Sequence, residues 1–448
     1  MGVSSFYGLQ TSLRGLIAQQ MALDTTGHNI ANASTDGYSR QKVNLAASPA
    51  LQVPTSGSVS PSGHLGSGVD VTGYTRVRDQ FLDTQYRAQN TGLQEQKARA
   101  DGLNAAELSL AEPGDSGINA ALDKFWSSWS DLEKTPDLAA AKQAVVSAGQ
   151  ALTDSIRSVR SQMVSAQADA QSQYDSIAGP GGDISQVASE LAGLNKSIAS
   201  YLVNGDSPND LMDRRDQLLD KLSGYGQISV QTLPTGSTNV SFVDSSTGTT
   251  YPVVSDQTAS WSGPPAGGWN PGGQLGGLLS VAKVPGGAAD GYLNTLDNFS
   301  AALASMVNTA YQGSFFTTGT PAGATVQVNP ALVTSPSAMV SGSGSAGSND
   351  IALAVSQLRG NASVDGVYKA FVAKVGSDVA EAQRLQANAQ VLTDSAQDRR
   401  ESVSGVSMDE EMSNLVTFQR AYQASSRAMS TMDEMLDVLI NRTGKVGL

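Results

Sequence analysis

The fold is decided by residues Met408 to Asn441, which read MDEEMSNLVTFQRAYQASSRAMSTMDEMLDVLIN. Steps of three and four residues through this stretch select mostly apolar side chains, and neither Gly nor Pro interrupts it. This spacing is typical of the narrow a/d seam of a coiled-coil helix. Such a helix would be roughly 50 Å long and needs a partner of similar length. The predicted seam residues are Met408, Leu415, Phe418, Tyr422, Met429, Met432, Leu436 and Leu439.

The partner that the sequence offers is the N-terminal segment, residues 5–32. Its apolar positions recur at helical spacing, and the only charged residues in the first 35 are Arg14 and Asp24. The predicted N-terminal seam residues are Leu9, Leu13, Leu16, Leu23 and Ile30. Because the other faces carry Gln, Thr and Ser, we expect this helix to be packed on several sides, as in a polymer. A buried helix of one large domain is the alternative.

The middle of the chain reads as helical on both sides of a β-rich insert. Residues 76–222 and 364–403 show heptad-like apolar spacing, which predicts long helices. Thr135-Pro136 is typical of a helix start, with Thr135 as the N-cap. Gly179-Pro180-Gly181-Gly182 ends that helix, and the same spacing resumes at Ile184, so we expect an antiparallel helical hairpin here.

The composition changes at Ser223. Between Lys221 and Lys283 there is no Lys or Arg, and short β-branched runs alternate with Gly-, Ser- and Thr-rich turns. This pattern predicts a small antiparallel β insert. The expected fold is mainly α with a small β insert (α+β, multidomain), in which the N- and C-terminal segments form a long antiparallel coiled coil. The expected domains are residues 1–60 with 405–448, residues 61–222 with 284–404, and residues 223–283.

The composition offers little material for catalysis or metal binding. The chain has no Cys and two His, which removes thiolate chemistry and leaves almost nothing for His-based sites. The net charge of -13 argues against a nucleic-acid partner. No apolar run is long enough to span a membrane, and the N-terminus does not read as a cleaved signal peptide. We therefore expect no catalytic, metal or cofactor-binding residues and no cofactor.

Two further motifs each allow a functional and a structural interpretation. Gly342, Gly344 and Gly347 match GxGxxG, but they lie in a Ser/Gly tract without the strand and helix that a dinucleotide site needs, which favours a flexible loop. A second group, Asp210, Asp213, Asp216 and Asp220, lies on successive turns of one helix with Arg and Lys interleaved. This pattern favours a solvated, locally paired helix face over paired catalytic carboxylates.

Three segments carry a resemblance to a known family. The turn NIANASTDGYSR, from Asn29 to Arg40, resembles the N-terminal signature of bacterial flagellar rod, hook and hook-associated proteins. The C-terminal stretch resembles the closing helix of the same family, and GSGVDV at 66–71 with RDQFL at 78–82 resembles its hook-associated branch. The residues of the signature turn are Asn29, Asn32, Asp36, Gly37 and Tyr38.

The resemblance implies a structural subunit, not an enzyme, at the junction between hook and filament. It implies that the terminal helices pair and line the axial tube. The implied partners are other copies of the chain in a ring-like homo-oligomer, the hook protein, the second hook-associated junction protein, and an export chaperone on the C-terminal helix. It also implies an extracellular, flagellar location reached by type III export without a cleaved signal peptide. The alternatives are a rod- or hook-type axial protein, and a secreted wall hydrolase carried on a flagellar scaffold.

Overall fold

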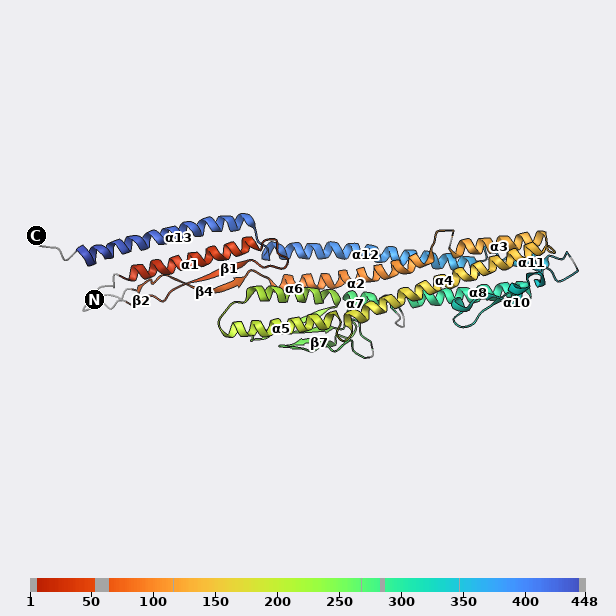
Figure 1. Cartoon of the computed structure of the whole chain (residues 1–448), viewed down its shortest axis with the longest axis horizontal. Helices are drawn as coiled ribbons and strands as arrows, with labels where there is room; N and C mark the ends of the chain where they lie inside the picture. The colour runs from red at the N-terminus through yellow and green to blue at the C-terminus, as the bar shows by residue number, and fades with distance from the viewer. Residues whose placement is uncertain are drawn as a thin grey trace, which may run out of the picture.

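The computed structural model describes residues 6–52, 64–115, 117–266, 268–282, 287–345 and 347–442. These residues form a long, thin molecule with an arm at one end and a helical body behind it (Figure 1). The arm contains α1 (Phe6–Ala31) and α13 (Met408–Asp437), which lie side by side although they come from opposite ends of the chain. A short π-helical turn, Val438–Arg442, continues α13.

An antiparallel β-hairpin covers α1. Its strands are β1 (Gln41–Ala47) and β4 (Val69–Arg76), and Gln41 pairs with Arg76 at the end nearest the body. A second, short antiparallel pair, β2 (Leu51–Gln52) and β3 (His64–Leu65), extends the hairpin. Alternating residues such as Val69, Val71 and Tyr74 are typical of an extended arm or hairpin, and the structure has the hairpin.

Behind the arm, α2 (Gln80–Leu110) packs along α12 (Val367–Ser404). The two helices are antiparallel, because Asp83 near the start of α2 lies 3.9 Å from Arg400 near the end of α12. Gly405 then caps α12, and α13 begins three residues later. The long helix expected over residues 364–403 thus ends at Ser404, before the terminal helix.

One hydrophobic core fills the far end of the body. It lies among α3 (Ile118–Lys134), α4 (Ala139–Ala178), α8 (Ala288–Tyr311) and α11 (Asp350–Ser356), together with α2 and α12. Trp126 and Trp129 are fully buried in it and pack against Phe125. Short elements line its surface: β9 (Phe316–Thr317), α9 (Ala322–Thr325), β10 (Gln327–Val328), α10 (Pro330–Thr334), η1 (Pro336–Ala338) and η2 (Ala362–Gly366).

A second core lies nearer the arm and joins helices to the β insert. The four strands pair in chain order as β5 (Ile228–Thr232), β6 (Thr238–Val243), β7 (Thr250–Ser255) and β8 (Thr258–Ala259). The sheet shares its core with α5 (Asp183–Val203), α6 (Asn209–Tyr225) and α7 (Gly273–Val281). The residues of the predicted insert therefore pack directly on helices outside it, and the division into domains stays a prediction.

The mainly α architecture with a small β insert is confirmed, but two local predictions are wrong. Thr135 is the C-cap of α3, and α4 begins at Ala139. The expected hairpin between α4 and α5 is absent from the described residues, because α5 continues beyond the end of α4 in the same direction (Figure 1). The helix that folds back along α5 is α6. A glycine-rich break interrupts a helix, but it does not fix the angle at which the next helix leaves.

Candidate assembly interface

Three close approaches set the register of α1 against α13. The Asn29 side-chain amide lies 3.1 Å from Glu411 Oε2. A Cβ added at Gly15 would lie 3.3 Å from Ser425 Oγ, and one added at Gly8 would lie 2.9 Å from Met432 Cε. From Gly8 to Gly15 to Asn29 on α1, the facing residue on α13 moves back by the same number of positions, from Met432 to Ser425 to Glu411. The pair is therefore antiparallel with one continuous register.

This register corrects the predicted N-terminal seam. Gly8, Gly15 and Asn29 belong to a heptad of small or polar residues, and the buried members of α1 lie on the same face: Ala18, Ala22, Thr25, Thr26 and Asn29. Four of the predicted seam residues, Leu9, Leu16, Leu23 and Ile30, are only half-buried, and Leu13 is 44% exposed. Small side chains on α1 allow the two helix backbones to approach closely at Gly8 and Gly15.

Of the predicted seam of α13, Met432 lies against Gly8 of α1, and the rest of this seam stays a prediction. Leu436 is buried, and five residues are half-buried: Leu415, Phe418, Tyr422, Met429 and Met432. Met408 is 47% exposed, because the buried contact begins one turn later, at Glu411. The side chain of Leu439 lies outside the described part of the chain. Met432 of α13 thus lies over Gly8 of α1, and Ser425 lies over Gly15.

The Asn29 side chain makes four hydrogen bonds that connect the signature turn to its neighbours. Its amide nitrogen donates to Gln41 O at 3.0 Å as well as to Glu411, and its oxygen accepts from the Tyr38 hydroxyl at 2.8 Å and from Gln41 N at 2.9 Å. The side chain is 1% exposed, so each polar atom is paired where water does not reach. One side chain thus fastens the end of α1 to β1, to the turn and to α13.

The rest of the signature turn bends the chain between helix and hairpin. The Asn32 amide donates to His28 O at 3.0 Å, which closes the last turn of α1. Gly37 has φ +72°, a left-handed conformation that favours glycine, and the neighbouring Asp36 O accepts a hydrogen bond from Gln217. Burial, and then Asp210, Asp213 and Glu411, raise the pKa of Tyr38, so its hydroxyl stays protonated and donates to Asn29.

Arg40 and Glu411 continue the connection into α13. Arg40 Nε donates to Glu411 Oε1 at 2.7 Å, and Arg40 Nη1 contacts Glu410 Oε2 at 2.8 Å. The Glu411 side chain is 2% exposed and also accepts from Asn29. On the backbone, Arg40 N donates to Ser404 O at 2.9 Å, which binds the end of α12. The first turn of α13 and the last turn of α12 are therefore both held by the segment that follows α1.

Next to this turn lies a cluster of ion pairs between arginines and aspartates, which we call the joint cluster. It shows that the prediction of a solvated helix face is wrong for Asp213 and Asp216. Asp213 and Asp216 on α6 are buried, and both contact Arg76 Nη1, at 2.7 and 2.8 Å. Further short contacts join Arg78 to Asp83, Arg87 to Asp220, and Arg400 to Asp220. Asp210 alone of the four is exposed. The arginines come from β4, from the segment between β4 and α2, from α2 and from α12, so spacing along α6 could not reveal them.

The electrostatics of the joint cluster favour the ionised forms. Burial on its own would raise the pKa of Asp216, but Arg78, Arg76 and Arg87 together outweigh it and hold the pKa below its usual value. Ser39 N also donates to Asp213 Oδ2 at 3.0 Å, which ties the signature turn to the cluster. The segment Arg76-Val77-Arg78, where the RDQFL stretch begins, contains two of these partners.

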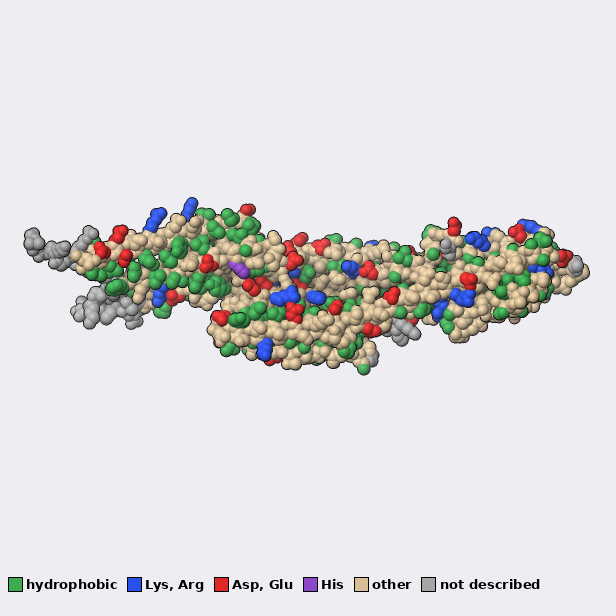
Figure 2. Space-filling model, viewed as in Figure 1, with side chains coloured by type: hydrophobic (Ala, Val, Ile, Leu, Met, Phe, Trp, Pro, Cys, Tyr) green, Lys and Arg blue, Asp and Glu red, His purple; other side chains and the backbone are tan. Residues whose placement is uncertain are grey.

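The outer faces of the arm are unusually apolar. Phe6, Leu13 and Ile17 on α1 are each more than 40% exposed, as are six residues on α13 and its extension: Met408, Met412, Val416, Met435, Val438 and Ile440. Figure 2 shows hydrophobic side chains gathered over the arm, with few charged groups among them. An apolar surface of this kind marks an interaction site.

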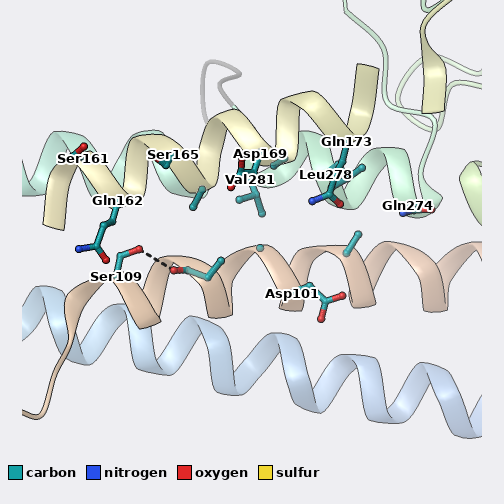
Figure 3. Close-up of a pocket in the computed structure, with 15 residues that line it drawn as sticks. Asp101, Ser109, Ser161, Gln162, Ser165, Asp169, Gln173, Gln274, Leu278 and Val281 are labelled. Carbon is teal, nitrogen blue, oxygen red and sulfur yellow. Dashed lines mark hydrogen bonds between the residues drawn. The ribbon is translucent and has the colours of Figure 1, made fainter. Parts of the chain in front are cut away.

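A groove of about 430 Å³ lies among α2, α4 and α7 (Figure 3), and its lining is mostly Ser, Gln and Ala. Its two carboxylates, Asp101 and Asp169, stand on opposite walls. Within the described ranges no group of three His, Asp or Glu side chains is placed to hold a metal ion. No helix in the same ranges has the length and hydropathy to cross a membrane.

Known proteins resemble this chain along its whole length. A family model of the flagellar hook-associated protein FlgK helical domain matches residues 103–326. A model of the flagella basal body rod protein matches residues 9–38, which end at Tyr38 of the signature turn. A model of the C-terminal part of the flagellar basal body rod FlgEFG proteins matches residues 397–442, which include Arg400 and α13.

Individual relatives of this chain are named flagellar hook-associated protein 1. Flagellar hook-associated protein 1 of Bacillus subtilis (strain 168) is 29% identical, over 99% of each chain. The proteins of that name from Salmonella typhimurium and Escherichia coli (strain K12) are 28% and 26% identical, and the chain spans less than half of their length. The flagellar hook junction protein FlgK from Burkholderia pseudomallei superimposes with a TM-score of 0.44 at 22% identity, over 53% of this chain and 47% of its own. Because the FlgK helical-domain model spans half of the 448 residues, the chain belongs to the family of flagellar hook-associated proteins that carry this domain.

Proposed function

We propose that this protein is a structural subunit of the bacterial flagellum that joins the hook to the filament. The observation that carries the proposal is the arm, in which an antiparallel pair of terminal helices leaves apolar side chains exposed on its outer faces. Burying such side chains against neighbouring subunits is favourable by about 25 cal/mol per Å² of apolar surface. The arm is thus the segment that a ring or tube of subunits would enclose.

The proposed partners follow from this role. Other copies of the chain would cover the exposed stripes of α1 and α13. The hook protein and the second hook-associated junction protein would adjoin the subunit on its two sides. Before assembly, an export chaperone would cover α13, whose apolar face would otherwise be open to solvent.

The proposed location is the flagellum outside the cell, reached through the type III export channel. A narrow channel requires a chain that crosses it unfolded. The absence of Cys from the sequence is compatible with this route, because no disulfide has to form or break.

Two alternatives remain distinct from this proposal. A rod- or hook-type subunit would share the terminal models, but the FlgK helical domain over residues 103–326 favours the hook-associated branch. A wall hydrolase would need free paired carboxylates, and the carboxylates of Asp213, Asp216 and Asp220 are each bound to arginine. We therefore propose a structural role without catalysis.

The deciding experiment removes residues 408–448 and follows incorporation in a strain that lacks the protein. The full chain should restore filaments, and electron microscopy of the deletion strain should show hooks without filaments and flagellin shed into the medium. The truncated chain should keep its helical body by circular dichroism but fail to restore filaments. Normal filaments on truncated subunits would refute the proposal, and so would peptidoglycan cleavage by the purified protein.

A further inference from the structure

A cavity of about 450 Å³ lies beside the joint cluster, between the arm hairpin and the body. Its walls come from β4, α2, α6 and the strands β5 and β6. Four arginines line it but only two carboxylates do: Arg76, Arg78, Arg87 and Arg215, with Asp83 and Asp216. Figure 2 shows basic and acidic side chains gathered in this part of the surface.

The ion pairs of the joint cluster are balanced before Arg215 is counted. Four arginines contact four aspartates: Arg76, Arg78, Arg87 and Arg400 with Asp83, Asp213, Asp216 and Asp220. Arg215 is the fifth arginine and makes no ion pair with any residue that the structure describes. It therefore adds one uncompensated positive charge to the wall of the cavity.

Arg215 is also short of hydrogen-bond partners. The residue is 6% exposed, and its Nη1 donates to Gly236 O at 2.7 Å. Its Nε is buried and has no partner among the described residues. Burial lowers the pKa of Arg215, and Arg76, Arg87 and Arg78 lower it further, against the opposing effect of Asp216. A buried cation in this setting is costly unless an anion approaches it.

We propose that this cavity is an oxyanion-binding site in which Arg215 is the principal charge partner. A guanidinium presents a planar fork of N–H groups that matches a carboxylate or a tetrahedral oxyanion. The carboxylate of an acidic side chain from a second copy of the chain and a free inorganic anion share this chemistry. The chain has 41 acidic and 28 basic residues, so a second copy is a ready source of carboxylates.

The first test compares the full chain with Arg215→Gln in sodium sulfate and in sodium chloride at matched ionic strength. The matched control is Arg214→Gln, which removes the same charge from the neighbouring residue, an exposed arginine paired with Glu190. Sulfate should raise the Tm of the wild type and of Arg214→Gln by about 1–2 °C more than that of Arg215→Gln. An equal sulfate response in all three proteins would overturn the proposal, because sulfate also stabilises proteins without binding.

A second measurement does not depend on the folding of Arg215→Gln. Arg215→Lys keeps the charge but lacks the Nε–H group, so the arginine Nε–H signal that disappears from its NMR spectrum identifies Arg215. That signal in the wild type should shift and saturate during a sulfate titration, and a signal that does not move would overturn the proposal.

Sedimentation velocity separates the two sources of the anion. If a second copy supplies the carboxylate, Arg215→Gln and added sulfate should each weaken self-association of the full chain. If a free anion fills the cavity, neither should change self-association, while the NMR titration still saturates.

Discussion

The side-chain amide of Asn29 donates to Glu411 Oε2 at 3.1 Å, across 382 residues of chain. Both side chains are almost completely buried, and Glu411 also accepts from Arg40. A hydrogen bond to a buried carboxylate is worth more than one between neutral groups. The last turn of α1 and the first turn of α13 therefore stabilise one another, and the arm requires both ends of the chain.

Replacing Asn29 with Ala should loosen the arm and leave the body intact. The substitution removes four hydrogen bonds and leaves Glu411 short of one donor, which should cost about 1–3 kcal/mol. Hydrogen exchange of the α13 amides should become faster, whereas amides of α4 should be unchanged. Asn32→Ala is the control, because the Asn32 side chain bonds only within its own turn. Equal effects of the two substitutions would contradict the role of Asn29 in connecting the signature turn to its neighbours.

Gly15→Val should force α1 and α13 apart. A Cβ added at this position would lie 3.3 Å from Ser425 Oγ, and Val adds two further methyl groups beyond that Cβ. Overpacking of this kind costs about 1–3 kcal/mol. Gly27→Val is the matched control on the same helix, because no atom lies within 4 Å of its added Cβ. Chemical denaturation of the full chain should separate the two variants, and a small-residue seam is ruled out if they unfold alike.

Gly37→Ala should destabilise the signature turn. The backbone has φ +72° there, and a side chain in the left-handed region costs about 1–2 kcal/mol. Gly193→Ala in α5 provides the opposite expectation, since Ala is the better helix former and no atom lies within 4 Å of its Cβ. Thermal unfolding should show a lower Tm for the first variant and an unchanged or higher one for the second. A stabilising Gly37→Ala would contradict the assigned conformation.

Acid should weaken the joint cluster. The pKa of Asp216 is lower in the folded protein than its usual value, so its ion pairs contribute fully above that usual value, about 3.9. The contribution is lost as the pH falls through the lower, folded pKa. Unfolding free energy measured from pH 7 down to pH 2 should therefore fall less steeply in Asp216→Asn than in the wild type. Asp154→Asn, an exposed pair within α4, should follow the wild type.

Some features could be predicted because their cause is local. The break before α13, the β1–β4 hairpin and the strands of the insert follow from glycine, alternation and composition. Trp126 and Trp129 could be placed in a core from their spacing alone. Other features depend on distant partners. The carboxylates of α6 read as solvated because Arg76, Arg87 and Arg400 lie far away in the sequence.

The sequence by itself determined that the two ends of the chain form long helices, that they pair, and to which family they belong. Apolar periodicity and the signature turn carry that information, because both depend on residues that are close together in the sequence. Only the tertiary structure decided which face of α1 meets α13. Leucine periodicity pointed to Leu9, Leu13, Leu16, Leu23 and Ile30, whereas the contact lies on Gly8, Gly15, Ala18, Ala22 and Asn29. The face that packs depends on how closely the two backbones can approach, and that distance depends on the side chains of both helices together.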